Sequence, residues 1–560
     1  MQIPKQFFTQ LHLVLFAAGM LLAVTVKAQQ PPAAGGTDDI APENIDIVKP
    51  YEPVLADAVK VEFLPDLPTK EELEKRKPSF SGYMVPNRFL SMSYDPLPLK
   101  PLAYKTQPKD NKELEKLHNI WLSAGYGNLK TPYIDAAVST GRSKKMIAGL
   151  HGNYLSSQGK LNLQDFARSG GGAYAKFFTK SNVIGVSADY RRDKYYFYGF
   201  NADTLLMPPP ENADSARQLF QTFSGAADFT NAIENKAETD YNLKLAFHRF
   251  TDNYEAKENN IIATGQIGKL FNEHSGVSVT VHTHYSAYKD TATFNNLLLN
   301  FIPAYSYRAL FGSVTLGANA MLDQSKFYAW PHLTISAIPV PDKLEIYGIW
   351  KKELVKNNFM ELASLNPFTN QYLQFQNSRR EERTLGLKGN AGTFSYNLKG
   401  GQEVIANQPL FVNDSTDLRK FNVLYDKVSA WFASAEAAVN FKQGGVNLAA
   451  RYNRFSTNEQ AEAWHLFPLN ISLTGNYNPL EKLSLQAALY VLNGAKAQIA
   501  NGQSTNLKGT IDINLSARYS IIENIAIFAN LNNIASVKAE RFLYYPGYGF
   551  NALGGITVRF

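Results

Sequence analysis

The sequence predicts an all-β membrane protein, an up-and-down transmembrane antiparallel β-barrel of about 22 strands preceded by a Pro-rich segment. Three observations predict this class. The chain opens with a secretory leader, apolar and polar residues alternate with a period of two from about residue 120 to the end, and short connections alternate with long ones. Alternate residues of a strand point to opposite faces, so each strand can offer an apolar face to lipid and a polar face to a lumen.

Residues 1–28 have the composition of a secretory signal peptide. Lys5 precedes an apolar run that ends near Val26, and small residues frame the expected cleavage between Ala28 and Gln29. The run is too short to span a bilayer comfortably, so we do not interpret it as a membrane anchor. No later stretch reaches ~18 consecutive apolar residues, which excludes helical membrane spans from the mature chain.

Residues 29–118 are predicted to form an extended periplasmic or lumenal segment with short helices. Thirteen of the 27 prolines lie between Pro31 and Pro108. Proline lacks the N–H that a sheet ladder needs, so this stretch cannot be central sheet. One short helix is expected to open at 69–72, which has capping-box spacing, and another at 111–119.

Composition narrows the class of protein further. The formal net charge is +7, and removal of Lys5 and Lys27 with the leader leaves +5 (7 − 2), too little at this length to indicate nucleic-acid binding. The chain has no cysteine, which excludes disulfides and a lipid-modified N-terminal cysteine. Its 30 Tyr and 35 Phe, beside 19% charged residues, suit a barrel with aromatic girdles at the membrane interfaces.

The connections distinguish a membrane barrel from a soluble sandwich, because alternation such as that of residues 511–520 fits both. One set of connections is short, for example 141–145 and 521–524. The interleaved set is long and polar or aromatic, for example 201–218 and 407–427. An up-and-down barrel has short turns at its inner end and long loops at its outer end.

The predicted barrel therefore occupies residues 119–560, and an even number of strands places both termini on the periplasmic side of a Gram-negative outer membrane. The chain ends on "GGITVRF", in which Ile556, Val558 and Phe560 fall on the apolar side of a strand. We expect this last strand to pair with the first near Trp121 and close the ring, which leaves no backbone group unpaired in lipid.

The ending "GFNALGGITVRF" resembles the C-terminal signature by which outer-membrane barrels are sorted to the barrel-assembly machinery. More narrowly, "NLNNIA…RFLYYPGYGFNALGGITVRF" looks like the ending of TonB-dependent receptor-type barrels of the Bacteroidetes-like group. The stretch from "LVKNNFMELASLNPF" through "ANQPLFVND" is similar to plugless members of that set. The resemblance implies as partners outer-membrane lipid and lipopolysaccharide, the assembly machinery, and a periplasmic or TonB-type protein contacting residues 29–118.

The chain departs from that family ahead of the barrel. The family's receptors carry a plug domain there, whereas only the Pro-rich residues 29–118 stand between leader and barrel. The resemblance therefore implies a solute transport conduit or receptor, with energised import in doubt. The alternative is a structural or assembly barrel that anchors a periplasmic partner-binding arm, since an extended segment can add to a partner's sheet edge.

The sequence predicts no enzyme, no catalytic residue and no cofactor. Ser157 and Lys160 have S-x-x-K spacing but are expected in a loop after a strand, and no nucleophile elbow, phosphate-binding loop or H-E-x-x-H motif occurs. His282 and His284 project from one polar strand face without an evident third metal ligand, so we interpret them as lumen-facing polar residues. Residues 414–417 lack the Gly and distal Glu of a calcium loop and are interpreted as a solvated turn.

The segment "RRDKYYFYGF" at 191–200 places five aromatic residues beside three cations at a strand-to-loop transition. It fits a sugar- or aromatic-binding surface at the barrel mouth. It also fits the outer aromatic girdle, with basic residues facing anionic lipid headgroups. We favour the girdle.

Overall fold

The computed structural model describes residues 119–141, 143, 145–199, 212–231, 239–272, 274–341, 343–371, 373–499 and 502–560. The expected signal peptide, its cleavage site at Ala28 and Gln29, and the Pro-rich segment 29–118 lie outside the described residues. The predicted barrel region is described, apart from short gaps in its connections.

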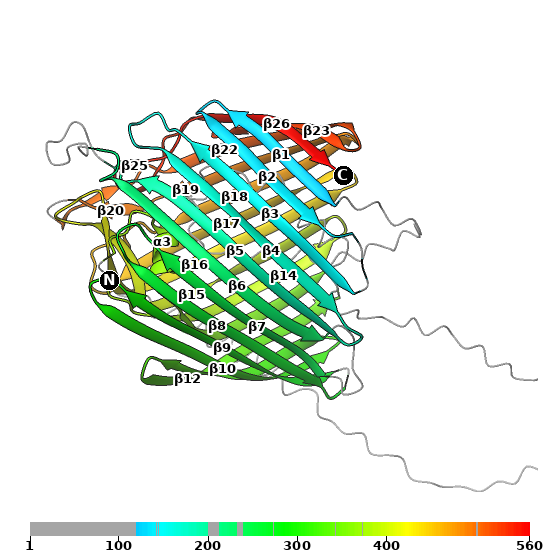
Figure 1. Ribbon diagram of the computed structural model, residues 1–560. Helices are drawn as coiled ribbons and strands as arrows, with labels where there is room; N and C mark the ends of the chain where they lie inside the picture. The colour runs from blue at the N-terminus through cyan, green and yellow to red at the C-terminus, as the bar shows by residue number, and fades with distance from the viewer. Residues whose placement is uncertain are drawn as a thin grey trace, which may run out of the picture. The chain divides into compact units, whose positions relative to one another are not determined.

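The described chain forms one closed antiparallel sheet of 22 strands, as predicted (Figure 1). The barrel strands in chain order are β1 (Ile120–Gly127), β2 (Thr131–Ser139), β3 (Met146–Ser157), β4 (Phe166–Phe178), β5 (Asn182–Tyr196), β6 (Arg217–Asn231), β7 (Thr239–Thr251), β8 (Lys257–Leu270), β9 (Ser275–Lys289), β10 (Thr293–Ala309), β11 (Gly312–Asp323), β12 (Lys326–Val340), β13 (Leu344–Val355), β14 (Ser378–Ala391), β15 (Phe394–Asn413), β16 (Phe421–Phe441), β17 (Gly444–Thr457), β18 (Leu469–Leu480), β19 (Leu483–Asn493), β22 (Thr510–Ile522), β23 (Ile525–Asn532) and β26 (Asn551–Arg559).

The long connections carry a few further elements. One is the helix α3 (Phe359–Leu365), and the others are two small strand pairs, β20 (Lys496–Gln498) with β21 (Ser504–Asn506) and β24 (Glu540–Phe542) with β25 (Tyr545–Pro546). Among the described residues, no helix is long and apolar enough to cross a membrane.

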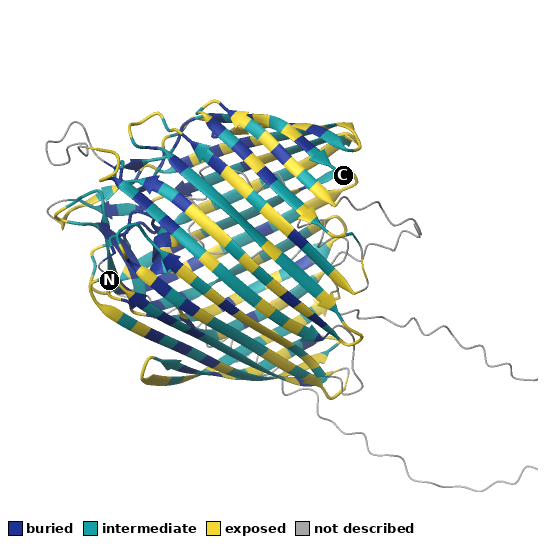
Figure 2. Cartoon of the chain, in the orientation of Figure 1, coloured by how far each residue is buried: buried dark blue, intermediate teal, exposed yellow. Residues whose placement is uncertain are grey.

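Burial alternates along the strands as the sequence pattern predicts (Figure 2). On β22 the apolar side chain of Leu515 is 44% exposed on the outer surface, whereas its neighbour Asn514 is 2% exposed and faces the lumen. The apolar residues of each alternation therefore face outward and the polar residues inward. This is the arrangement of a barrel in lipid rather than of a soluble barrel with an apolar core.

Placing a charge on the two faces of β22 should have very different effects. Leu515→Arg should destabilise the barrel by about 2–4 kcal/mol if the residue lies near the bilayer midplane, because the guanidinium would face hydrocarbon. Ser516→Arg should cost little, because Ser516 lies on the lumen-facing side of the same strand and is only partly buried, unlike Asn514, whose Oδ1 accepts from the N–H of Asn533 at 3.0 Å. Heat-modifiable gel mobility of the two variants checks this, and equal effects would show that the faces are assigned wrongly.

The terminal strand closes the ring as predicted. β26 pairs with β1 in antiparallel register, with Val558 opposite Leu122 and Ile556 opposite Ala124. The backbone N–H of Phe560 donates to the carbonyl of Ile120 at 2.9 Å, and the N–H of Ile120 donates to the carbonyl of Phe560 at 2.9 Å. The last residue of the chain therefore forms the last pair of the barrel.

The alternation of short and long connections holds only in part. At the end expected to carry long loops, β1–β2, β9–β10 and β11–β12 are joined by the short turns 128–130, 290–292 and 324–325. The expected bounds of one long loop are also wrong. Residues 407–427, expected as a long loop, are mostly strand, because β15 continues to Asn413 and β16 begins at Phe421. A register shift near Asn407, whose φ is +60°, redirects the hairpin. Its apolar residues pack against other loops, for example Leu410 against Trp464, so the hairpin is stabilised beyond the point where the sequence predicted its end.

β12 and β13 pair with each other only in the half of the seam next to their short connecting turn. Cross-strand partners run from Val340 opposite Leu344 to Leu333 opposite Trp350, and both strands then continue without pairing to each other. Pro331, which has no N–H to donate, lies in the unpaired part of β12. Beyond the paired part, the Nδ2 of Asn319 on β11 donates to the carbonyl of Lys352 on β13 at 2.9 Å.

Candidate functional site

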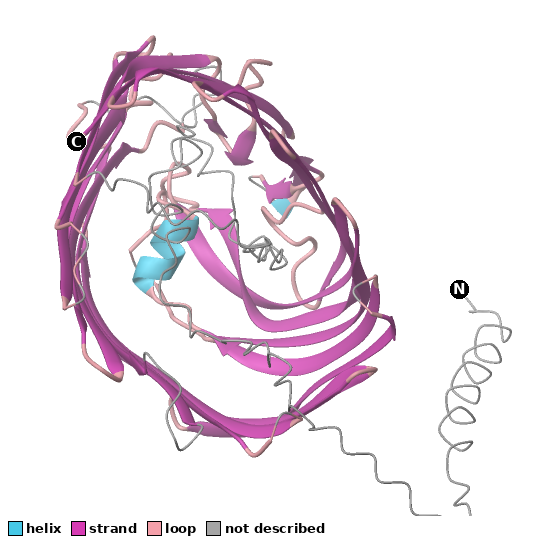
Figure 3. Cartoon of the chain, turned by 90° about the vertical axis from the view of Figure 1, so that its right-hand side faces the viewer, coloured by secondary structure: helices cyan, strands magenta, loops and turns pink. Residues whose placement is uncertain are grey.

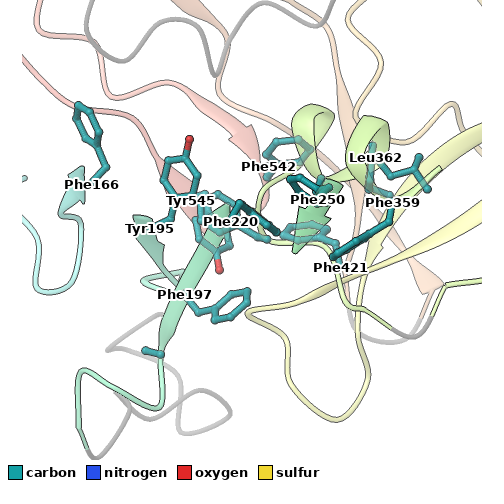
Figure 4. Packing of buried hydrophobic residues seen from close by; sticks show 14 of the residues in the cluster. Phe166, Tyr195, Phe197, Phe220, Phe250, Phe359, Leu362, Phe421, Phe542 and Tyr545 are labelled. Carbon is teal, nitrogen blue, oxygen red and sulfur yellow. The ribbon is translucent and has the colours of Figure 1, made fainter. Parts of the chain in front are cut away.

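The loop end of the lumen holds a group of buried aromatic and aliphatic side chains that we call the mouth cluster (Figure 4). The barrel wall and the inward-folded connections both contribute to it. Its buried members are Tyr133, Leu155, Phe166, Tyr195, Phe197, Ala216, Phe220, Phe250, Ala256, Tyr288, Phe359, Leu362, Ala363, Phe368, Phe375, Phe411, Phe421, Phe528, Phe542, Tyr545, Tyr548 and Leu553. Polar side chains line the remainder of a barrel wall of this kind, so this cluster marks where the loops close the lumen.

The connection between β13 and β14, residues 356–377, lies inside the ring of strands and carries helix α3 (Figure 3). We call it the mouth segment. Asn358 caps the helix, since its side chain accepts from the N–H of Glu361 at 2.9 Å. The spacing of Phe359, Leu362 and Ala363 puts these buried residues on one helix face. That face packs into the mouth cluster.

A buried carboxylate on the barrel wall fastens the start of α3. Glu258 of β8 is fully buried and accepts from the N–H groups of Phe359 at 2.7 Å and Met360 at 3.2 Å. The Nδ2 of Asn260 also donates to Glu258, at 2.8 Å. A negative charge at a helix N-terminus satisfies otherwise unpaired N–H groups and is favoured by the helix dipole. The mouth segment is therefore docked to the wall by hydrogen bonds from the first turn of α3 to a buried carboxyl group.

Asn260 and Lys356 extend this anchor. The Nδ2 of Asn358 donates to the Oδ1 of Asn260 at 2.8 Å, and the Nζ of Lys356 donates to the carbonyl of Asn296 at 2.7 Å. Burial of the amine lowers the pKa of Lys356 to about 7, with partial compensation from Glu258. Near neutral pH the docked segment thus avoids burying a full positive charge.

The far end of the mouth segment is tied to strands β9 to β11. The hydroxyl of Tyr288 donates to the carbonyl of Gln371 at 2.6 Å. The Nδ2 of Asn377 donates to Asp323 at 2.7 Å and to Asn296 at 2.9 Å. Both ends of the segment are thus held by noncovalent contacts with the wall, an arrangement that can be released without unfolding the barrel.

The connection between β23 and β26, residues 533–550, completes the closure. The ring of Tyr545 stacks on Phe368 of the mouth segment, with centroids 3.6 Å apart, and its hydroxyl donates to the carbonyl of Arg419 at 2.5 Å. The hydroxyl of Tyr198 donates to the carbonyl of Pro546 at 3.0 Å. Four connections from distant parts of the sequence therefore meet in the mouth.

A cavity of about 60 Å³ remains between these connections and the wall, bordered by aromatic residues and two buried charges. Asp512 is 1% exposed and Arg541 is 5% exposed. Within the described residues, neither carboxylate oxygen of Asp512 nor the Nε of Arg541 has a hydrogen-bond partner. Burial lowers the pKa of Arg541 to about 9. The cavity can hold one or two waters or a small polar group with both donors and acceptors.

The segment 191–200 contributes to this site, and its preferred interpretation as an outer girdle is wrong for Tyr195 and Phe197. Tyr195 and Phe197 are buried in the mouth cluster. Asp193 turns inward too, within 2.6 Å of Arg191. The alternative, an aromatic surface at the mouth, fits their position. The period-2 pattern could not distinguish a girdle from a mouth surface here. The strand reaches its loop at this point, and side chains on both of its faces contact other residues.

The other motifs have structural partners. Ser157 is the last residue of β3 rather than a loop residue, and its buried hydroxyl accepts from the hydroxyl of Thr131 at 2.9 Å. His284 faces the lumen, as predicted, with its Nε2 3.1 Å from the Oδ1 of Asn260. His282 lies on the same face, with its Nδ1 2.9 Å from the hydroxyl of Thr264. The described part of the chain contains no group of three His, Cys, Asp or Glu side chains that could hold a metal ion.

Residues 414–417 form the predicted turn. The carboxylate of Asp414 accepts from the N–H groups of Thr416 at 2.7 Å and Asp417 at 3.1 Å. Asp417 in turn accepts from the Nε of Arg419 at 2.7 Å. These contacts fix a local turn between β15 and β16.

No family model and no curated protein matches the sequence. Solved structures do match its fold. The FrpB iron transporter of Neisseria meningitidis (F3-3 variant) aligns with a TM-score of 0.62 at 11% identity, covering 80% of this chain and 82% of that one. The siderophore receptor PirA of Acinetobacter baumannii aligns with a TM-score of 0.62 at 8% identity, covering 80% and 81%.

The ferripyoverdine receptor of the outer membrane of Pseudomonas aeruginosa aligns with a TM-score of 0.58 at 10% identity, covering 80% of this chain and 72% of that one. The names of these neighbours describe receptors and an iron transporter. The resemblance to TonB-dependent receptor-type barrels is confirmed at the level of the fold: the chain is a closed 22-stranded barrel of the type found in outer-membrane siderophore receptors.

Proposed function

We propose that this chain is an outer-membrane solute receptor and transport conduit whose outer mouth is closed by the mouth segment. The observation that carries the proposal is the docking of residues 356–377 inside the lumen by noncovalent contacts at both ends, through Glu258 and through Asn377. A wide barrel needs a filling for its lumen, and here the chain's own connections supply one.

The chain is proposed to reach the outer membrane after cleavage between Ala28 and Gln29 and sorting by the barrel-assembly machinery through its last strand. Both termini then lie in the periplasm, because β1 begins and β26 ends at the end of the barrel with short connections. Residues 29–118 are proposed either to enter the lumen from its periplasmic end or to contact a periplasmic or TonB-type partner. Outer-membrane lipid and lipopolysaccharide surround the wall.

Conductance across a planar bilayer tests this proposal. The purified full-length protein should show gated ion conductance, and removal of residues 29–110 should raise it if that segment occupies the lumen. If the segment is instead a partner-binding arm, conductance should stay the same and proteins that co-purify from native membranes should be lost. A barrel that stays sealed with and without residues 29–110, and passes no solute in liposome swelling, would contradict a transport function.

A further inference from the structure

Beyond the part of β12 that pairs with β13, two aromatic rings on the inward face of β12 contact the neighbouring strands. Phe327 of β12 is 69% exposed on the outer surface, so Tyr328 and Trp330 point the other way. The two rings are stacked, with their centroids 5.1 Å apart. The Nζ of Lys352 lies 5.0 Å from the ring centroid of Trp330, and the guanidinium carbon of Arg379 lies 5.3 Å from that of Tyr328.

Lys352 and Arg379 belong to the outward faces of β13 and β14. Lys352 lies two residues along β13 from Trp350, whose side chain is 39% exposed on the outer surface. Arg379 lies opposite Leu354, two residues further along, and the pairing of β13 with β14 has no bulge. Alternate residues of a strand share a face. Since the inward face of β12 contacts these outward faces, the outer half of the β11–β12 hairpin lies over the outside of β13 and β14. We call this half, residues 317–332, the flap.

Apolar side chains fill the space under the flap. Leu298 of β10 and Met321 of β11 are 1% and 0% exposed, and they form one cluster with Leu354 of β13. The two rings of β12 pack against this cluster. One hydrogen bond, from the Nδ2 of Asn319 to the carbonyl of Lys352, also joins the flap to β13. The flap is therefore held on β13 and β14 by side-chain contacts, because β12 and β13 do not pair there.

The tip of the flap is tied to the mouth segment. The Nδ2 of Asn377, at the end of that segment, donates to Asp323 at the end of β11 at 2.7 Å and to Asn296 of β10 at 2.9 Å. A cavity of about 590 Å³ lies beside this tie, and the flap tip, the mouth segment and Arg379 all line it. Its volume is within the range of ligand sites. The mouth segment and the flap therefore share an anchor, with a cavity where they meet.

The overlap lies at the height of the outer leaflet. Trp350 and Val355 lie 6 and 11 residues beyond Leu344, where β13 begins at a short turn (350 − 344 and 355 − 344). With a rise of ~3.3 Å per residue and a strand tilt of ~40°, the overlap spans heights of about 15–28 Å above that turn. The apolar band of such barrels is ~25 Å tall. In the outer-membrane orientation proposed above, acyl chains of the outer leaflet therefore contact the edge of the flap.

We propose that the flap lifts and opens a lateral passage between the mouth and the outer leaflet for an apolar solute. Lifting breaks no strand ladder between β12 and β13, because none is formed there. It exposes Leu298, Met321 and Leu354, so the passage suits an apolar molecule rather than a hydrated ion. Release of the mouth segment at Asn377 also frees the tip of the flap, which couples the two movements. The inference rests on the outer-membrane orientation proposed above, and it gives the proposed conduit an apolar solute.

Labelling of a cysteine under the flap tests this passage in phospholipid vesicles, since the chain has no cysteine of its own. Met321→Cys should react slowly with pyrenyl maleimide, which partitions into acyl chains. Adding Asn377→Ala removes two hydrogen bonds at the tip of the flap and leaves the apolar cluster around Met321 unchanged. Labelling by pyrenyl maleimide should then accelerate about tenfold. A sulfonated maleimide, which stays in water, should gain much less.

Gln374→Ala is the matched control, because Gln374 is an exposed amide of the mouth segment three residues before Asn377. It should leave labelling unchanged. Heat-modifiable mobility confirms that each variant is folded, and Leu354→Cys, on the β13 side of the apolar cluster, takes the place of Met321→Cys if that variant does not assemble.

Two results would overturn the inference. Equal pyrenyl labelling with and without Asn377→Ala would show that the tie does not control a flap. An equal gain by the sulfonated maleimide would show that the overlap opens to water and not to lipid. The labelling needs no conductance, so a barrel that fails the conductance and swelling tests but labels as expected would contradict the transport proposal and keep the flap.

Discussion

Glu258→Ala should release the mouth segment from the barrel wall. The carboxylate is fully buried and accepts from two helix N–H groups and from Asn260. Its removal leaves the N–H groups of Phe359 and Met360 buried without an acceptor. A buried donor left unsatisfied costs ~1–3 kcal/mol, so docking should weaken by about 3 kcal/mol. That corresponds to a rise of roughly a hundredfold in the undocked population.

A single cysteine can report this change, because the chain contains none. Ala363→Cys is a small substitution at a buried position of α3. In an otherwise unchanged barrel this thiol should react slowly with a water-soluble maleimide. Adding Glu258→Ala should accelerate labelling by roughly two orders of magnitude and raise conductance in parallel.

Glu255→Ala provides the control for Glu258→Ala. Glu255 lies in the connection that leads into β8, three residues before Glu258, and is exposed. It should leave labelling of the cysteine unchanged. If labelling is equally slow with and without Glu258, the wall contact does not hold the segment. If labelling accelerates while conductance stays closed, the segment moves but other connections seal the mouth.

The wall of the barrel could be predicted from the sequence because the orientation of each of its residues follows from neighbouring residues in the chain. The alternation that places Asn514 inward and Leu515 outward is a property of neighbouring residues in the chain, and so is the spacing of short turns. Closure by Phe560 follows from an even strand count and the need to pair every backbone group in lipid. These rules require no knowledge of which distant residues meet.

The mouth could not be predicted in the same way, because its contacts join residues far apart in sequence. Glu258 caps a helix about one hundred residues later, and nothing in "AKENNI" marks it as a helix partner. Tyr545 stacks on Phe368 for reasons visible only once the barrel has brought their connections together. The prediction that Tyr195 belongs to the outer girdle is wrong for the same reason. Where loops fill the lumen, aromatic side chains can be buried on the inward face of a strand as well as on its outward face. The period-2 alternation then no longer tells which aromatic residues face lipid.

The many aromatic residues of the chain therefore occupy two kinds of position. Girdle positions such as Trp350 and Trp431 do lie on the outer surface. Many other rings, including Phe359 and Phe421, are buried in the mouth cluster. A signal that could have indicated this is the density of Phe, Tyr and Asn in the long connections, since a solvated loop has no need for buried rings.

Deleting Phe560 should sharply reduce the amount of assembled barrel. In the folded structure the residue contributes two backbone hydrogen bonds with Ile120, and its ring is 61% exposed. Little packing is therefore lost on deletion, and the two bonds lie at the rim, where water can replace them in part. A loss of folded-state stability alone would be modest. The larger effect is expected during assembly, because the aromatic end resembles the signature by which barrels are sorted.

Phe560→Ala separates the two causes, since alanine keeps both backbone bonds with Ile120 but lacks the ring. If recognition of the aromatic residue dominates, Phe560→Ala and the deletion should both leave unfolded chain to periplasmic proteases and lower the outer-membrane level strongly. If the closing pair dominates, only the deletion should do so.

A charged tail appended after Phe560 should act like the deletion, because β26 meets β1 at this residue and the tail would have to leave the seam. Outer-membrane fractions compared by immunoblot, with heat-modifiable mobility as the measure of folding, give the answer, and normal levels of the truncated barrel would refute both causes.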